Sequence, residues 1–219
     1  MTARELTSNV ILPLRTSDNG EFGLSLMNEF YVKHLPIVNN NQLLGLISET
    51  DILEHDAMAA VGSYNLSLNR PYVTAEDHLF DVMRTMSEYN LTVIPVVEGE
   101  DHYVGLITQE DLIQYYASSF SFAARGSIIV LEMSKSEYSL ATLSQIVESE
   151  NGTVLSTFIT SDHDSPHVLV TLKINKQDIS SILAAFQRYE YVVNATFTET
   201  DYYDTLKERY DMLMSYLNV

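Results

Sequence analysis

Apolar and polar positions follow one another in the same order twice in the first half of the chain. Residues 33–53 read KHLPIVNNNQLLGLISETDIL, and residues 92–113 read TVIPVVEGEDHYVGLITQEDLI. In each copy two short apolar runs flank a polar turn, which predicts two strands joined as a hairpin. The predicted strands cover residues 35–38 and 43–47 in the first copy, and residues 93–97 and 103–107 in the second.

Each hairpin is predicted to lie between two helices. Apolar residues ahead of the hairpins recur every three positions, which places them on one helical stripe. At an offset of 59 residues, Asp18 and Asp77 precede these helices as predicted N-caps. Short extended segments, 10–14 and 72–74, come before each unit. The matching stripe residues are Leu24, Met27 and Phe30 in the first copy, and Met83, Met86 and Tyr89 in the second.

Each hairpin ends in one signature: Gly, two apolar residues, Ser or Thr, two variable residues, and Asp. It reads GLISETD at 45–51 and GLITQED at 105–111. Glycine within a strand allows another group to approach the backbone closely. The Ser or Thr is suited to begin the helix that follows the hairpin. The repetition in matching context predicts a duplicated unit.

The signature also supports binding chemistry. The hydroxyls of Ser48 and Thr108, with the free backbone N–H groups of a helix start, can form an anion site without a lysine. Asp51 and Asp111 lie three residues later, on the same helical face, and a carboxylate can accept both hydroxyls of a ribose. The apolar strands can enclose a flat base. The alternative is that Ser/Thr-x-x-Asp is only a helix-capping pair.

These residues resemble the tandem CBS domain (Bateman) module. The resemblance covers about residues 1–118 and implies that the Ser or Thr contacts phosphate while the Asp holds the ribose. It assigns Ser48 and Asp51 to one site, and Thr108 and Asp111 to the other. We favour the second site, because its lead-in resembles the family more closely. The residues that resemble the adenine-contacting strands are Leu35, Ile37, Ile94 and Val96.

The second half of the chain has a different pattern. Strands are predicted at 128–133, 154–160, 168–174 and 191–197, and helices at 140–150 and 179–189. The order βαββαβ indicates a ferredoxin-like sandwich. After a CBS pair, such a unit resembles an ACT domain, as in CBS–ACT proteins of the acetoin-utilisation type. The turn at 134–139 lacks the glycine typical of an amino-acid site, so we expect this domain to serve dimerisation.

The predicted fold class is therefore α+β, with a tandem CBS pair of βαββα repeats and a ferredoxin-like, ACT-like domain. We place the first repeat at 1–60, the second at 61–118, a Ser/Ala-rich linker at 119–126 and the ACT-like domain at 127–200. Residues 201–219 are predicted to form an amphipathic helix. Its apolar stripe contains Leu206, Tyr210, Leu213 and Leu217.

Composition narrows the range of functions. The net charge is −18, from 12 Lys and Arg against 30 Asp and Glu, which argues against binding to nucleic acid or an anionic membrane. The absence of Cys excludes disulfides and thiolate chemistry. No apolar run approaches 18 residues and the start lacks a signal-peptide core, so we expect a cytoplasmic protein. Basic residues near the signatures are scarce, and Lys33, Arg70 and Arg84 are the main candidates. This favours a mono- or diphosphate, or a neutral adenosyl compound, over a triphosphate.

Catalytic and metal-binding readings are weaker. His163, Asp164 and His167 lie in a predicted hairpin loop, which provides no rigid spacing for a metal, so we interpret them as solvated. No nucleophile with a nearby base and no Gly-rich phosphate loop is present. We therefore predict no catalytic residues, no metal and no cofactor.

The favoured function is a non-enzymatic regulatory module. It would bind an adenosine-containing nucleotide (AMP, ADP, ATP or an S-adenosyl compound) and signal to an unidentified protein partner through its conformation or through packing of a homodimer. Two alternatives remain: a structural dimerisation protein without a ligand, and an amino-acid sensor acting through the ACT-like domain.

Overall fold

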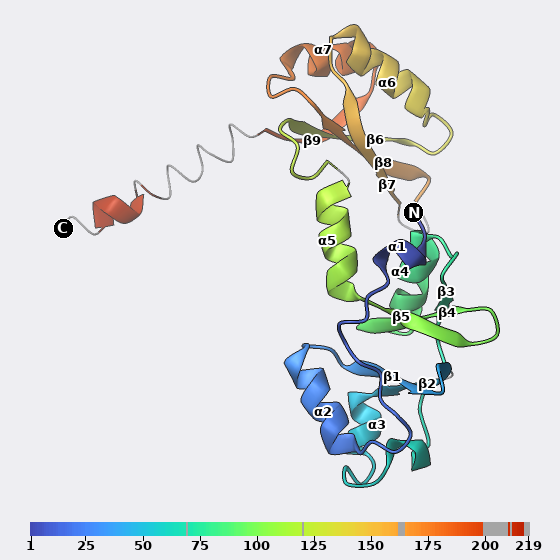
Figure 1. The fold of residues 1–219 in the computed structure, drawn as a ribbon. Helices are drawn as coiled ribbons and strands as arrows, with labels where there is room; N and C mark the ends of the chain where they lie inside the picture. Colours follow the sequence, from blue (N-terminus) through green and yellow to red (C-terminus); the bar gives the residue numbers. More distant parts are fainter. Residues whose placement is uncertain (69, 120, 162–164, 199–209, 211, 217–219) are drawn as a thin grey trace. The chain divides into compact units, whose positions relative to one another are not determined.

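The computed structural model describes residues 1–219 except 69, 120, 162–164, 199–209, 211 and 217–219. The chain divides into two compact units, Met1–Tyr115 and Tyr116–Val219. Each unit has its own sheet (Figure 1). The fold class is the predicted α+β arrangement, with a repeated unit followed by a ferredoxin-like unit.

The sheet of the first unit is built from the two predicted hairpins. Strands β1 (His34–Asn39) and β2 (Gln42–Ser48) pair antiparallel, as do β4 (Val93–Glu98) and β5 (His102–Thr108). The strand order is β1-β2-β5-β4-β3, and the hairpins meet where Gln42 pairs with His102. Both hairpins carry a register shift at the same place, after Ile37 in β1 and after Val96 in β4. The duplication thus extends to the irregularities of the strands.

The extended segments ahead of the hairpins also correspond. We call residues 7–14 the first lead-in and residues 66–73 the second lead-in. Strand β3 (Val73–Thr74) pairs parallel with β4 through Val73 and Val96. In the first repeat the corresponding pair, Leu14 and Ile37, forms a single parallel bridge. Of the extended segment predicted at 10–14, only Leu14 forms a bridge to the sheet.

Helices flank each hairpin as the apolar stripes predict. Their caps differ from the prediction, because Asn19 and His78 cap α2 and α4 through bonds to Phe22 N and Phe80 N. Asp18 and Asp77 instead accept from the backbone N–H three residues earlier and close the preceding turn. The helices of the first unit are α1 (Ala3–Leu6), α2 (Gly20–Glu29), α3 (Glu49–Leu53), the 3-10 turn η1 (Val61–Ser63) and α4 (Leu79–Glu88); α5 (Gln109–Ser119) begins in this unit and ends in the second.

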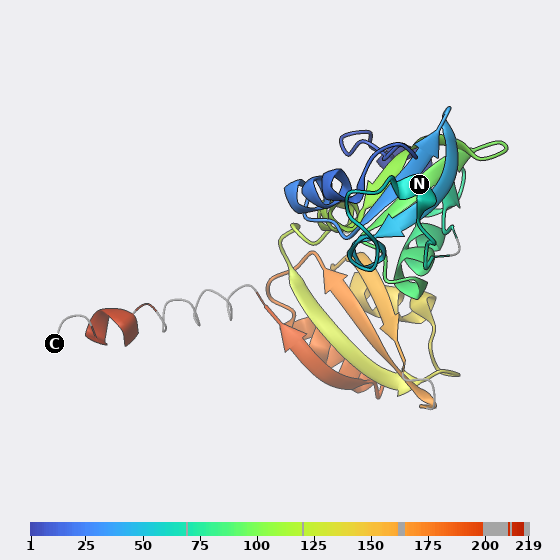
Figure 2. The same ribbon diagram turned by 90° about the horizontal axis from the view of Figure 1, so that it is seen from below.

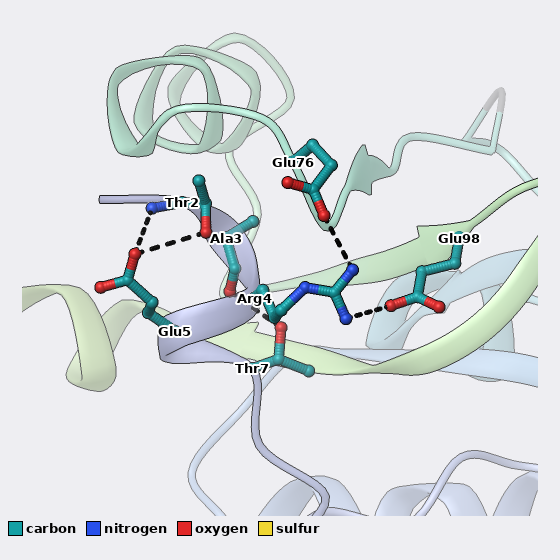
Figure 3. Close-up of polar contacts among 7 residues, drawn as sticks. All are labelled: Thr2, Ala3, Arg4, Glu5, Thr7, Glu76 and Glu98. Atoms are coloured by element: carbon teal, nitrogen blue, oxygen red, sulfur yellow. Dashed lines mark hydrogen bonds and ion pairs between the residues drawn. The ribbon is translucent and has the colours of Figure 1, made fainter.

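The N-terminal helix α1 is attached to the second repeat. Backbone N–H groups of Ala3 and Arg4 donate to Asp77 O and Ala75 O at 2.9 and 3.0 Å. The Arg4 guanidinium forms ion pairs with Glu76, at 2.8 Å, and with Glu98 (Figure 3). Thr7 Oγ1 donates to Ala3 O at 2.8 Å and closes the helix. These contacts fix the start of the first lead-in beside the second repeat.

The second unit is a ferredoxin-like sandwich. Strands β6 (Ser127–Ser134), β7 (Val154–Thr160), β8 (His167–Ile174) and β9 (Val192–Phe197) form an antiparallel sheet in the order β7-β8-β6-β9. Helices α6 (Leu140–Ser149) and α7 (Ser180–Arg188) cover one face, and Figure 2 shows the sheet with these helices behind it. Alternate β6 residues are buried against them in the core.

The predicted C-terminal helix is only partly within the described residues. Tyr210 and residues 212–216 are helical, and Leu213 is exposed. Leu206 and Leu217 lie outside the described residues.

Candidate functional site

The two signatures form the same local structure. In the first, Ser48 N and Oγ donate to Asp51 Oδ2 at 2.8 and 2.7 Å, and Asp51 N donates to Ser48 Oγ at 3.0 Å. In the second, Thr108 and Asp111 form the same three bonds at the same lengths. Both pairs are therefore reciprocal capping boxes, as the alternative interpretation expected. Capping and binding are compatible only if the carboxylate keeps an oxygen for a ligand.

Asp51 keeps no such oxygen. Its side chain is 1% exposed, and its Oδ1 accepts a hydrogen bond from Ser67 N, in the second lead-in, at 2.9 Å. Burial by itself raises the pKa of Asp51, but the hydrogen bonds from Ser48 and Ser67 outweigh it, and the pKa is lowered. The carboxylate is therefore ionised and fully engaged within the protein.

Asp111 has a different environment. It is partly exposed and lines a cavity of about 490 Å³ within the first unit. Among the hydrogen bonds of the described residues, those of its side chain reach only Oδ2. Oδ1 is thus available to accept a bond from a ligand, and of the two signatures the second has the open carboxylate.

The walls of this cavity come from four separate segments. Besides the signature and α5, they include Ser8, Val10 and Ile11 of the first lead-in, Thr92 before β4, and residues 30–32 at the end of α2. Tyr31 is the most unusual, since it is 94% exposed and has a left-handed backbone with φ +54°. The repeated pattern could not predict Tyr31 as a site residue, because the corresponding residue of the second repeat is Asn90.

The four strand residues expected to contact the base do not line the cavity. Leu35, Ile37, Ile94 and Val96 are 0–3% exposed and belong to the core of the first unit. Burial is continuous along the middle of both strands, so these residues face the interior of the unit and not the cavity. The apolar residues at the cavity instead include Val10, Ile11, Val32 and Ile113.

The glycines of the signatures allow the lead-ins to approach the strands. A Cβ on Gly45 would lie 2.7 Å from Leu66 Cδ1, in the second lead-in. A Cβ on Gly105 would lie 2.5 Å from Thr7 Cγ2 and 2.7 Å from Ser8 O, in the first lead-in. Ser8 and Leu106 exchange backbone hydrogen bonds of 2.9 and 3.0 Å. Each lead-in therefore packs on the hairpin of the other repeat before it joins its own.

Hydrogen bonds join Lys33 and His34, at the start of β1, to Thr92 in the cavity wall. Thr92 N donates to His34 Nδ1 at 3.2 Å, and Thr92 Oγ1 accepts from Lys33 N at 2.8 Å. His34 Nδ1 is consequently unprotonated, and its ring proton is on Nε2. Burial lowers the pKa of His34, against the opposing charge of Asp51. The neutral ring thus links the start of β1 to a residue that lines the cavity.

Comparison with known families identifies the duplicated unit. The model of the CBS domain matches twice, at residues 5–57 and 62–118, which together make up just over half of the chain. The chain belongs to the CBS domain family. The first unit, with its paired hairpins and exchanged lead-ins, is its CBS pair.

Individual relatives match over shorter parts. An uncharacterised protein of Methanocaldococcus jannaschii is 30% identical over 92 residues, 42% of this chain and 35% of that protein. The L-aspartate semialdehyde sulfurtransferase of the same organism is 31% identical over 87 residues, 39% of this chain and 17% of that enzyme. The chain thus spans about a third or less of the curated relatives that it matches.

Several solved structures are similar to about half of the chain. A CBS domain pair/ACT domain protein from Thermotoga maritima is 18% identical, with a TM-score of 0.49, over 54% of this chain and 98% of that one. The acetoin utilisation protein AcuB from Vibrio cholerae, described as putative in its structure, is 20% identical, with a TM-score of 0.48, over 56% of this chain and 95% of that one. CBSX2, solved in complex with AMP, is 22% identical, with a TM-score of 0.44, over 52% of this chain and 93% of that one.

The second unit has a cavity of its own. It measures about 550 Å³ and lies at the end of β6, next to the turn at 134–139. Its polar lining includes Glu132, Glu137, His167 and Glu190. The three carboxylates make the cavity acidic, and hydrogen bonds from Ser134 lower the pKa of Glu137. An amino acid would bring an ammonium group that these carboxylates attract and a carboxylate that they repel.

Among the described residues, no group of three or more His, Asp or Glu side chains is arranged to hold a metal. His163 and Asp164, of the loop at 161–167, lie outside these residues. No helix in the described part of the chain is long and apolar enough to cross a membrane.

Proposed function

We propose that this CBS pair is a regulatory module that binds an adenosine-containing ligand in the cavity beside Asp111. The observation that carries the proposal is the difference between two identical capping boxes. Asp51 Oδ1 accepts from the chain's own Ser67 N, whereas Asp111 lines a cavity of about 490 Å³ and its side-chain hydrogen bonds to the described residues reach only Oδ2. One repeat is closed by its own backbone, and the other keeps the same carboxylate available for a ligand.

The cavity offers the contacts that a nucleoside requires. A ribose hydroxyl can donate to Asp111 Oδ1 in the way that Ser67 N donates to Asp51. The base can lie against Val10, Ile11 and Val32, with the exposed ring of Tyr31 available for stacking. A mostly apolar cavity with a few fixed polar groups is typical of small-molecule sites. We assign Thr108 and Asp111 to this site and leave Ser48 and Asp51 a structural role.

Binding at this cavity can be passed to the rest of the chain. Its walls belong to the first lead-in, the end of α2 and the start of α5, so a ligand contacts both repeats at once. A ligand that prefers one arrangement of these segments shifts their equilibrium by its difference in affinity. CBS domain proteins are generally regulatory, and we propose that this one acts on a protein partner in the cytoplasm without catalysing a reaction.

Isothermal titration calorimetry tests the proposal with adenosine, AMP, ADP, ATP and S-adenosylmethionine. We expect at least one to bind, and Asp111→Asn to weaken that binding by roughly tenfold or more, because a hydrogen bond to a carboxylate is lost. Asp51→Asn is the matched control, since it alters the same capping box but not the cavity. Absence of binding by all five compounds would refute the proposal. An equal loss of affinity in Asp111→Asn and Asp51→Asn would contradict the assignment of the site to Asp111.

A second candidate function is an amino-acid sensor. The cavity at the end of β6 lies where the first strand of the ferredoxin-like unit meets its turn, which is the position that an ACT-like domain would use. A thermal-shift screen of the twenty amino acids separates the two functions. A rise in melting temperature that persists in Asp111→Asn would favour the second unit as the sensor.

A further inference from the structure

Most of the donors at the start of α5 are already engaged within the protein. Thr108 N and Oγ1 both donate to Asp111 Oδ2, at 2.8 and 2.7 Å. Asp111 N donates to Thr108 Oγ1, and Gln109 N donates to Thr92 O, each at 3.0 Å. A helix start binds anions through N–H groups that lack partners. Here three of those backbone groups and the Thr108 hydroxyl donate to protein oxygens.

The charges around the cavity also oppose an anion. Glu110 and Asp111 line it, and none of its lining residues is a Lys, Arg or His. The cations expected near the signatures are engaged elsewhere. Arg70 forms an ion pair with Asp101 at 2.8 Å, and Arg84 forms one with Asp81 at 2.7 Å. Lys33 follows Val32 but is not among the lining residues. The net charge of −18 adds a long-range field of the same sign.

The cavity nevertheless retains what a nucleoside without phosphate needs. Asp111 Oδ1 can accept a ribose hydroxyl. The Nε2 groups of Gln109 and Gln114 donate to Leu91 O and Glu110, but their side-chain oxygens can accept bonds without requiring charge. The side chain of Glu110 accepts from Gln114 Nε2 at 3.0 Å, which holds a negative charge at the rim. A cation placed on the 5′ side of an adenosine would be attracted to these carboxylates.

We infer that the site selects adenosyl compounds that carry no phosphate, and that among these it prefers a cationic one. This inference rests on the proposed function, since it names the ligand class of the same cavity. The two carboxylates and the engaged helix start discriminate against AMP, ADP and ATP. Ribose and base provide the affinity, and the sign of the charge at the 5′ position sets the preference.

Calorimetry on the full chain at low ionic strength tests the inference with two matched pairs of probes. Adenosine and AMP differ by the phosphate, and we expect AMP to bind about tenfold more weakly or worse. S-adenosylmethionine and S-adenosylhomocysteine differ by the methyl group that makes the sulfur cationic, and we expect the cationic compound to bind more tightly. Both differences in affinity should decrease at high salt, because salt screens the charges that cause them.

Variants that remove one carboxylate test whether Glu110 causes the weaker binding of AMP. Glu110→Gln should reduce the ratio of the affinities for adenosine and AMP by about two- to fivefold, the range expected for an exposed charge. The control is Glu49→Gln, which removes a carboxylate from the first turn of α3 in the other repeat and should leave the ratio unchanged. AMP binding as tightly as adenosine, while both bind, would overturn the inference and leave the proposed function standing. Failure of every adenosyl compound to bind would overturn both.

Discussion

Tyr31 has a left-handed backbone conformation that suits Asn90, its counterpart in the second repeat, better than it suits a tyrosine. Its φ is +54°, and Asn90, at the corresponding position of the second repeat, has φ +51°. Asn tolerates the left-handed region, whereas a bulky side chain there is an outlier associated with functional sites. Since Tyr31 is almost fully exposed, its ring gains little from packing to offset this cost. Its place at the cavity is the reason we find for keeping Tyr there.

We therefore predict opposite effects of Tyr31→Asn on stability and on binding. The free energy of unfolding should rise by about 1 kcal/mol, because the left-handed backbone is relieved. Affinity for the adenosyl ligand should fall by roughly fivefold or more, because the stacking ring is lost. Urea denaturation and calorimetry measure the two quantities. The reciprocal variant Asn90→Tyr should lower stability and leave binding unchanged. A loss of stability in Tyr31→Asn would contradict the argument.

His34 predicts a dependence of stability on pH. Its pKa is lowered in the folded chain because the ring is partly buried, so the unfolded chain takes up a proton first as the pH falls. The contribution of His34 is therefore complete above its unfolded pKa of about 6.5 and is lost below it. Protonation would also place a hydrogen on Nδ1, which accepts from Thr92 N.

The urea midpoint should accordingly decrease between pH 7.5 and pH 5.5. His34→Asn should show a smaller decrease, since the amide oxygen can accept from Thr92 N at either pH. An equal decrease in both proteins would assign the effect to other groups. Asp51 acts in a separate range, because its pKa is lowered and its contribution is lost only as the pH falls below about 4.

The signature residues were predictable from the sequence, but the difference between the two sites was not. The residue types and spacing of Ser48 and Asp51 predict the bonds that form, and the same holds for Thr108 and Asp111. What closes the first site is a backbone N–H, that of Ser67, 16 residues further along the chain. A backbone donor has no residue type, so no motif could have indicated it. Our preference for the second site agrees with this geometry, although the reason we had was a different one.

At the scale of elements, the periodicity of apolar residues predicted the strands and helices correctly. It did not predict which of two neighbouring polar residues caps a helix. Strands and helices of both units follow the predicted runs, because alternation and three-residue stripes mark the buried faces. The N-caps moved by one residue, to Asn19 and His78, because Asp18 and Asp77 close the preceding turns. The packing of each lead-in on the hairpin of the other repeat depends on contacts between distant parts of the chain. In the sequence, only the strand glycines indicated that another segment approaches the strands closely.

That exchange predicts unequal costs for the two strand glycines. Gly105→Ala should lower the free energy of unfolding by about 2 kcal/mol, because the new Cβ would meet the backbone oxygen of Ser8 and Gly105 has φ +153°. Gly45→Ala should cost about 1 kcal/mol less, because it meets only the flexible end of Leu66. Urea denaturation of both variants measures the difference. A larger cost at Gly45 would mean that the second lead-in is the more rigidly held of the two.

At the scale of the whole molecule, apolar exposure and net charge act against each other. Helices α2 and α4 expose Phe22, Phe80 and Met83, and Phe80 is 63% exposed. Exposed apolar side chains favour association with a partner surface. Each copy carries a net charge of −18, however, and two such copies repel each other. The expected homodimer is therefore a balance of a short-range attraction and a repulsion that salt can screen.

We predict that the chain forms a homodimer whose stability rises with salt. Light scattering after gel filtration should give a mass near twice the monomer value of 24.8 kDa, with a larger dimer fraction at 0.5 M than at 0.05 M NaCl. Phe80→Glu should favour the monomer, since it removes an apolar contact and adds charge to the interface. Met58→Glu adds the same charge at an exposed loop residue and should change the balance little. A dimer that weakens as salt rises would show that ion pairs hold it, and would locate the interface away from these apolar helices.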